Sequence, residues 1–211
     1  MARPVFRKKR FGVMPGAPGG VSALVTGLGN PGERYRQTRH NTGFMAADKL
    51  LESSSVGRES QTPQGVVSLA ESGGVRFLVL KPWTYMNLSG KAVLAAMKHY
   101  RLVPGQLVVV HDDIDIPAGE VRIKKNGGAG GHRGVASIIE ALGAGDFTRV
   151  RIGVGRPPGG QDATQYVLSQ LTRGELTDIE VSASIAAEKV LGVLAEMGRR
   201  PGGCKLDQEE S

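Results

Sequence analysis

Polar side chains capable of chemistry gather at the ends of two apolar runs in this chain. The first run, residues 21–28, leads into a polar loop that carries Asn30, Tyr35, His40 and Asn41. The second, near the middle of the chain, ends in a histidine followed by two aspartates. Such side chains can transfer protons, ligate metals or contact nucleotides. A polar loop at the end of a buried strand is more typical of a site than of a connector.

A glycine pattern in the first loop tests the nucleotide-binding possibility. Gly27-x-Gly29-x-x-Gly32 has the spacing of the dinucleotide fingerprint. The fingerprint needs its third glycine inside a helix, but Pro31 precedes Gly32 and the next nine residues lack apolar periodicity. Asp48, at a plausible distance for a ribose-binding acid, falls on the polar face of an expected helix. The sequence therefore disfavours nucleotide binding.

Metal ligation is the second possibility. The chain has four histidines and one cysteine, with no H-x-x-x-H or C-x-x-C spacing. The densest cluster, His111 with Asp112, Asp113 and Asp115, lies at one strand end, where successive side chains point in alternating directions. We therefore predict no metal site and no cofactor.

Four ordered sequence blocks give a more specific indication. They are Gly27-Leu-Gly-Asn-Pro-Gly-Glu-Arg-Tyr-Arg-Gln-Thr-Arg-His-Asn-Thr-Gly43, Lys81-Pro-Trp-Thr-Tyr-Met-Asn-Leu-Ser-Gly90, His111-Asp-Asp-Ile-Asp-Ile-Pro117, and Gly127 to Gly134 followed by Arg149-Val-Arg-Ile-Gly-Val-Gly155. Together they resemble the bacterial-type peptidyl-tRNA hydrolase family over roughly residues 21–198. The resemblance implies an enzyme that cleaves the ester joining the peptide to the terminal ribose of N-acyl-aminoacyl-tRNA, and so recycles tRNA from stalled translation.

The resemblance also implies which residues do the chemistry. His40 would be the general base that activates water, and Asp112 would hold the tautomer of the His40 ring and stabilise its imidazolium form. Asn30 and Asn87 would polarise the ester carbonyl and bind the peptide side. The chain contains no serine elbow and no reactive cysteine, so direct attack by water is the simplest mechanism.

Substrate binding is assigned in the same way. Tyr35 would line the entrance of the site and Met86 one of its walls. Lys124 and Arg151 match the residues with which the family clamps the tRNA 5′-phosphate. Where family members often carry asparagine in a G-G-H-N-G block, this chain has Arg133. Arginine has donors but no acceptor, so we expect Arg133 to bind a ribose or phosphate oxygen rather than to position water.

Several local alternatives stay open. His40 could cap the helix expected near Thr42, and Asp113 or Asp115 could replace Asp112 as the functional carboxylate. His111 could be a second base, although a histidine after a buried strand is more often structural and hydrogen-bonded. The glycine-dense segment before Arg133 could cradle phosphate or form a flexible loop. The alternative function is a non-catalytic RNA-binding protein on the same fold, resembling the chloroplast intron-splicing paralogues.

Composition limits the setting. At 211 residues, 40% of them hydrophobic, the chain can form one domain with a sizeable core. The net charge of +7 favours a polyanionic partner, here tRNA. We expect a flexible basic extension over residues 1–20, the catalytic domain over 21–198 and a flexible tail over 199–211. The single cysteine, Cys204, fits a reducing cytoplasm, and no apolar run reaches membrane-spanning length, so no membrane partner is expected. We also expect a monomer.

Hydrophobic periodicity predicts alternating strands and helices. Strands are expected at residues 21–28, 65–70, 75–80, 107–110, 120–124 and 150–154, and helices at 42–51, 89–100, 135–142 and 175–197, the second of them capped by Ser89. The two strands between residues 65 and 80 form a predicted hairpin. The pattern predicts a single three-layer α/β domain with a mixed, mostly parallel twisted sheet flanked by helices.

Overall fold

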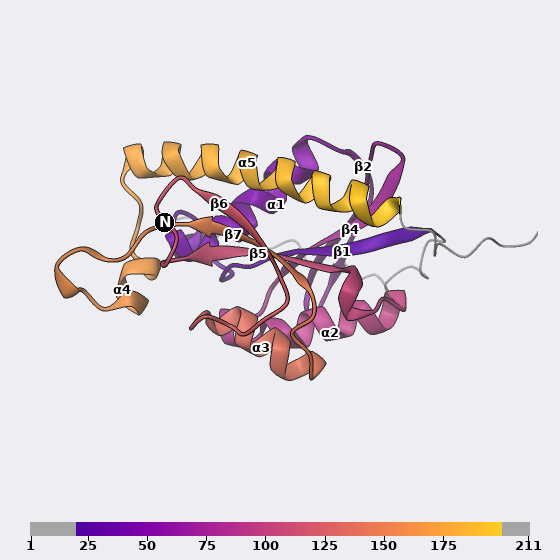
Figure 1. Ribbon diagram of the computed structural model, residues 1–211, viewed down its shortest axis with the longest axis horizontal. Coiled ribbons are helices and arrows are strands. Elements are labelled where there is room, and N and C mark those ends of the chain that lie inside the picture. The colour runs from indigo at the N-terminus through magenta and orange to yellow at the C-terminus, as the bar shows by residue number, and fades with distance from the viewer. Residues whose placement is uncertain (1–19, 200–211) are drawn as a thin grey trace, which may run out of the picture.

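The fold is a seven-stranded mixed sheet between two layers of helices, and the computed structural model describes residues 20–199 of it (Figure 1). The strands are β1 Val21–Gly27, β2 Ser55–Thr62, β3 Gly65–Ser72, β4 Val75–Pro82, β5 Leu107–Asp113, β6 Val121–Lys125 and β7 Thr148–Gly153. The longer helices are α1 Thr42–Glu52, α2 Ser89–Tyr100, α3 Arg133–Leu142 and α5 Arg173–Gly198, and a short helix, α4, covers Ala163–Leu168.

The sheet has the strand order β2-β3-β4-β1-β5-β7-β6. The four central strands run parallel, whereas β2, β3 and β6 add to the edges through antiparallel pairs. Nearly every residue of β1 and β5 is buried, as expected for central strands covered on both faces. The predicted mixed α/β fold is confirmed, and its carboxyl-end edge collects the loops after β1, β4 and β5.

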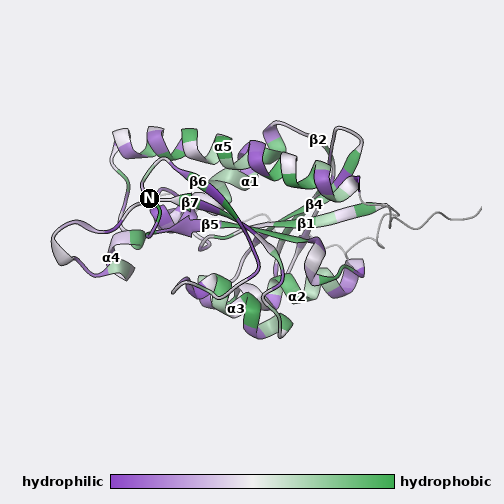
Figure 2. Cartoon of the chain, in the orientation of Figure 1, coloured by the Kyte–Doolittle hydropathy of each residue, from purple (hydrophilic) through white to green (hydrophobic). Residues whose placement is uncertain are grey.

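Two hydrophobic cores hold the layers together. One lies under α1 and α5 and includes Phe77 and Val110. The other lies under α2 and α3 on the opposite face and includes Leu24 and Val109. Figure 2 shows α5 with alternating hydrophilic and hydrophobic bands, because one side of this helix faces the sheet and the other faces solvent.

Three local predictions were incomplete or wrong. Strand β2 was missed because most of its side chains are exposed, and backbone pairing with β3 holds it in the sheet. Helix α4 was missed because it is only six residues long. Ser89 is not a helix cap: it is the first residue of α2, and its buried hydroxyl has no hydrogen-bond partner within residues 20–199. The predicted hairpin is confirmed and turns at Gly73 and Gly74, both with positive φ.

The predicted domain of residues 21–198 falls wholly within the described part of the chain. The predicted basic extension and most of the predicted tail, with Cys204, lie outside the described residues. Among residues 20–199, no helix is long and apolar enough to cross a membrane.

Close backbone approach fixes the position of α1 against the sheet. A Cβ at Gly43 would lie 2.4 Å from the carbonyl oxygen of Val110 and 2.5 Å from backbone atoms of Leu28. A Cβ at Gly27 would lie 2.3 Å from the carbonyl oxygen of Gly43. The start of α1 can therefore rest directly on β1 and β5 only because both positions are glycine, and this contact places the residues just before α1 at the carboxyl end of the sheet.

The Gly43→Ala substitution should lower the free energy of unfolding by about 1–3 kcal/mol, because backbone atoms must move to admit the methyl group. Urea denaturation measures the change. Gly192→Ala is the matched control: its Cβ would meet nothing within 4 Å in α5, and it should raise stability by about 0.5–1 kcal/mol through helix propensity. A Gly43→Ala protein as stable as the wild type would contradict the role given to this contact.

Candidate active site

A pair of amide hydrogen bonds closes the loop that carries His40. The Asn41 side chain accepts from the backbone N–H of Asn30 at 2.9 Å and donates to the Asn30 carbonyl at 3.0 Å. Residues 39–41 form a single 3₁₀ turn, and all three are buried. The loop after β1 therefore folds back onto its own start and delivers His40 just before α1.

Arg39, the neighbour of His40, anchors the same turn from the other side. Its guanidinium lies 4.1 Å from the centre of the Tyr166 ring and donates to the Ser169 hydroxyl at 3.1 Å. It also forms an ion pair with Glu175 in the first turn of α5. Arg39 is 7% exposed, whereas the Glu175 side chain is 42% exposed, so the guanidinium is buried and the carboxylate stays in contact with water. The segment that includes α4 is thus tied to the residue next to His40.

His40 is paired with the carboxylate at the end of β5. Its Nδ1 lies 2.9 Å from Oδ1 and 3.1 Å from Oδ2 of Asp112. An ionised carboxylate only accepts hydrogen bonds, so Nδ1 carries the proton and Nε2 carries the lone pair. Among residues 20–199, Nε2 has no hydrogen-bond partner. The helix-capping alternative for His40 is wrong, since no side chain caps α1.

Asp112 is ionised although it is only 2% exposed. Burial by itself raises the pKa of this carboxyl, but the polarity and hydrogen bonds of His40 and His132 outweigh burial and lower the pKa below its ordinary value. The other two candidate carboxylates are engaged elsewhere: Asp113 accepts from Arg151 and Asp115 from Arg156. Of the three aspartates, Asp112 is the one that contacts His40.

His132 is the second histidine that contacts Asp112. Its Nε2 lies 3.0 Å from Asp112 Oδ1, the same oxygen that His40 approaches. Its Nδ1 accepts hydrogen bonds from the backbone N–H groups of Gly134 and Val135, both at 3.2 Å, so His132 is the N-cap of α3. The Asp112 carboxylate is therefore held between two imidazole rings from different segments.

His111 has a structural position, but its hydrogen bonding is incomplete. Its Nδ1 donates to the carbonyl of Asp112 at 2.6 Å, whereas its buried Nε2 has no partner among the described residues. Burial, with a smaller contribution from His132, lowers the pKa of His111 to about 3. The ring is therefore neutral near pH 7, and the expectation of a fully hydrogen-bonded structural histidine was wrong at Nε2.

The His40–Asp112 pair opens onto a cavity of about 260 Å³. The cavity is walled by the end of β5, the glycine-rich segment before α3, and α4, and its lining includes Asp113, Gly130, Gly131, His132, Arg133 and Val167. A larger hollow of about 470 Å³ lies beside it, lined in part by Asn30, Phe44, Lys81 and Trp83. We take the smaller cavity as the reaction site, because it contains the buried histidine–carboxylate pair.

None of the four residues expected to bind the peptide lines this cavity. Asn30 lines the larger hollow; its Oδ1 accepts from the backbone N–H of Met86 at 2.8 Å, which leaves its Nδ2 donor unused among the described residues. Met86 is buried and packs against Gly134, where a Cβ would lie 2.4 Å from its sulfur. Asn87 is exposed in the short 3₁₀ helix Met86–Leu88 directly before α2, and Tyr35 is half-buried under the Arg34 guanidinium.

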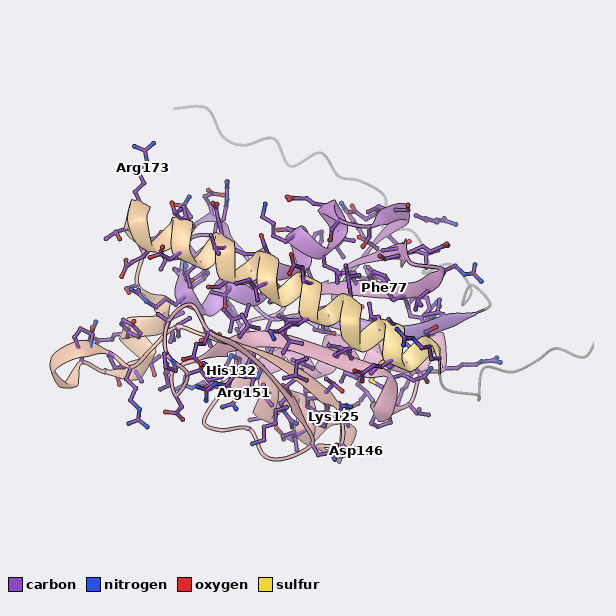
Figure 3. The ribbon with its side chains drawn as sticks, turned by 45° about the horizontal axis from the view of Figure 1, so that its top comes forward. Phe77, Lys125, His132, Asp146, Arg151 and Arg173 are labelled. Atoms are coloured by element: carbon purple, nitrogen blue, oxygen red, sulfur yellow. The ribbon has the colours of Figure 1, made fainter. Side chains whose placement is uncertain are left out.

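The three cations expected to bind tRNA differ in their pairing. The Arg151 Nε donates to Asp113 at 2.7 Å, so this guanidinium is already part of an ion pair. Lys124 is exposed, and no described residue forms an ion pair or hydrogen bond with it. Arg133 is exposed at the start of α3, lines the cavity and likewise lacks an acidic partner among residues 20–199. In Figure 3, Arg151 and His132 lie in the same region of the molecule, whereas Arg173 extends away from it.

The spacing of His40, Asp112 and His132 raises the question of a metal ion, since one potential ligand atom of each lies within 4.8 Å of the others. Sequence spacing could not indicate this group, because its members come from three segments. The hydrogen bonds disfavour it. A metal at His132 Nε2 would force the ring proton onto Nδ1, where two backbone N–H groups already donate. The group therefore fits a hydrogen-bonded network better than a metal site.

Sequence analysis missed two residues of the site, Asn41 and His132. Asn41 was noted only as a polar residue. Its two hydrogen bonds to the Asn30 backbone close the loop, and they depend on a distance that the sequence does not show. His132 was assigned to the glycine-rich segment, with α3 expected to begin at Val135. The helix begins at Arg133, and a helix start placed there would have marked His132 as the N-cap.

The buried, neutral His111 predicts acid-sensitive stability. Because its folded pKa is lowered to about 3, the unfolded chain binds more protons below about pH 6.5, and stability falls by up to about 1.4 kcal/mol per pH unit as pH decreases. Asp112 acts in the same direction only below about pH 4. His111→Gln should flatten the pH dependence of the unfolding free energy between about pH 7 and pH 5. His99→Gln controls for the loss of one histidine; equal slopes in His111→Gln and wild type would contradict the assignment.

Comparisons with known proteins agree with the resemblance. The sequence model of the peptidyl-tRNA hydrolase family matches residues 24–201. A protein named peptidyl-tRNA hydrolase from Syntrophotalea carbinolica is 45% identical over 170 residues, covering 80% of this chain and 89% of that protein; one from Carboxydothermus hydrogenoformans is 44% identical over 173 residues, covering 82% and 92%. The crystal structure of peptidyl-tRNA hydrolase from Acinetobacter baumannii superposes with a TM-score of 0.71 at 29% identity, covering 87% of this chain and 97% of that one. This chain therefore belongs to the peptidyl-tRNA hydrolase family.

Proposed function

We propose that this protein hydrolyses N-acyl-aminoacyl-tRNA at the ester between the peptide and the terminal ribose, using water activated by His40. The observation that carries the proposal is the buried His40–Asp112 pair: the carboxylate holds Nδ1, and Nε2, at the cavity, has no hydrogen-bond partner among the described residues. This is the arrangement that a general base needs, because the base must be neutral, oriented and within reach of water.

In the reaction, His40 Nε2 takes a proton from water as the water oxygen attacks the ester carbonyl carbon. Asp112 stabilises the imidazolium that forms. The tetrahedral intermediate collapses by breaking the bond to the ribose oxygen, and the imidazolium returns its proton to that oxygen. The products are tRNA with a free ribose hydroxyl and a peptide carboxylic acid, which loses the remaining proton of the water to solvent and becomes a carboxylate; His40 is neutral again.

We assign Asn30 and Asn87 to the peptide side and to the developing oxyanion. Asn30 is oriented by its hydrogen bond from Met86, so its free Nδ2 is a pre-positioned neutral donor. Asn87 lies in the exposed segment directly after Met86. Tyr35 is assigned to the entrance and Met86 to the wall. These two assignments follow the family pattern, and Tyr35 borders neither the His40 cavity nor the larger hollow.

We assign the tRNA side to Lys124, Arg151 and Arg133. Arg151 lies on β7, opposite His111 of β5. Lys124 lies on the edge strand β6, opposite Arg149 of β7, so the two cations come from the two strands next to β5 on this side of the sheet. The ion pair with Asp113 uses only the Nε of Arg151, which leaves its two Nη groups for a phosphate. Arg133 extends this cationic edge to the cavity.

The setting we infer is tRNA recycling by a monomer in the cytoplasm, without a metal or cofactor. The non-catalytic RNA-binding alternative has no support from the described residues, since the base, its carboxylate and the cavity are all intact. Release of free tRNA from N-acetyl-aminoacyl-tRNA, with unblocked aminoacyl-tRNA as the control substrate, tests the proposal. Binding of tRNA without release would favour the alternative.

His40→Ala should lower kcat by about 10²-fold or more and leave tRNA binding largely intact, because the ring does chemistry rather than hold phosphate. Turnover of N-acetyl-aminoacyl-tRNA and a binding assay with deacylated tRNA provide the two measurements. His99→Ala, at the far end of α2, is the matched control and should keep full turnover. A His40→Ala enzyme with near-normal kcat would reject His40 as the base.

Arg133→Asn and Lys124→Gln should weaken tRNA binding while keeping kcat within about tenfold. Each lost phosphate contact should reduce the slope of log K against log salt by roughly 0.7–0.9. Arg173→Gln is the control for altered net charge, because it also removes one exposed cation and its side chain extends away from His132 and Arg151 (Figure 3). A collapse of kcat at unchanged KM in Arg133→Asn would show instead that this arginine acts at the reacting centre.

A further inference from the structure

His132 joins a helix terminus to the proposed catalytic pair. Its Nδ1 accepts from two backbone N–H groups of α3, which fixes the ring as the tautomer with its proton on Nε2. That proton points at Asp112 Oδ1, 3.0 Å away. Protonating Nδ1 would break both cap bonds at the positive end of a helix, so the cap favours the neutral ring.

The Asp112 side chain depends on this contact for its orientation. Its hydrogen-bond donors among the described residues are His40 and His132, and the side chains of both Asp112 and His132 are more than nine-tenths buried. Without His132, the carboxylate would keep His40 as its one partner and could turn with the ring. With His132 in place, Oδ1 is fixed from two directions, and so is the direction in which Nδ1 of His40 must point.

The surrounding charges leave this arrangement intact near neutral pH. His111, whose ring centre lies 4.6 Å from that of His132, is neutral. Asp113 borders the cavity but is neutralised by Arg151, and Arg39 is paired with Glu175. Arg133 is the cation that lines the cavity. The negative charge of Asp112 therefore acts mainly on His40. The neutral His132 ring donates one hydrogen bond to the carboxylate and so weakens that interaction.

We propose that His132 is a positioning residue: by capping α3 with Nδ1 and donating from Nε2, it aims the Asp112 carboxylate at the general base. The inference rests on the proposed hydrolysis. His132 does not act as a second base here, because both of its nitrogens are already engaged. His132 also links α3 to the catalytic pair. The start of this helix carries Arg133 and forms part of the cavity wall.

The variant His132→Ser separates the two roles of the ring. Serine caps helices well, so α3 should stay intact, but the short side chain cannot reach Asp112. We expect kcat to fall by about tenfold or more. We also expect the acid limb of the pH–rate profile to move to higher pH by about half a unit, since the carboxylate no longer shares its charge and holds the imidazolium more strongly. Glu140→Gln on the same helix should change neither quantity.

A second readout works without turnover. In protein with ¹⁵N-labelled histidine, the His40 titration followed by NMR should show the same upward shift in His132→Ser. If the wild type lacks hydrolysis but this shift occurs, the proposed function fails while the positioning contact stands. Unchanged kcat, or a lower kcat with an acid limb and a His40 titration that stay in place or move to lower pH, would overturn the inference and leave His132 a structural cap only.

Discussion

The Asp112 carboxylate is the group on which the site depends. Asp112 is only 2% exposed, and a buried carboxylate is unfavourable unless hydrogen-bond donors and positive partial charges replace its contacts with water. Here two imidazole N–H groups do so, one from the loop after β1 and one from the cap of α3. Both segments must therefore meet at the end of β5. The glycine contact between α1 and the sheet brings the first, and the packing of α3 on the second core brings the other.

Much of the fold could be predicted because its central strands are continuous apolar runs. Val21–Gly27 and Leu107–Asp113 are buried on both faces. Strands buried in this way consist mostly of consecutive apolar residues, which can be recognised in the sequence. Strand β2 carries no such signal: its residues are exposed, and its place depends on backbone bonds to a neighbouring strand. The ends of helices were also uncertain, because caps such as His132 depend on side-chain geometry and not on hydrophobic periodicity.

The site was predicted in its parts but not in its arrangement. His40 and Asp112 were chosen by family pattern, and they lie within hydrogen-bond distance although 72 residues separate them. Their third partner, His132, could not be identified from spacing, since nothing local links it to a strand end. Asn30 shows the converse: it belongs to the loop that delivers His40, yet it lines the neighbouring hollow. A sequence motif therefore identifies the segment that carries a functional side chain. The backbone conformation of that segment determines which cavity the side chain lines.

The net charge of the protein also says little about individual cations, because ion pairs decide which of them are available. On and just after β6 and β7, four cations are paired with acidic residues: Arg122, Lys125, Arg151 and Arg156. The net charge of +7 therefore does not translate into a uniformly basic surface. Exposed ion pairs contribute only about 0–1 kcal/mol each, and a phosphate can compete for their cations. Lys124 and Arg133 have no acidic partners in the described part of the chain, and only Arg133 lines the cavity. If the proposed function holds, recognition of tRNA depends on these few unpaired cations more than on total charge.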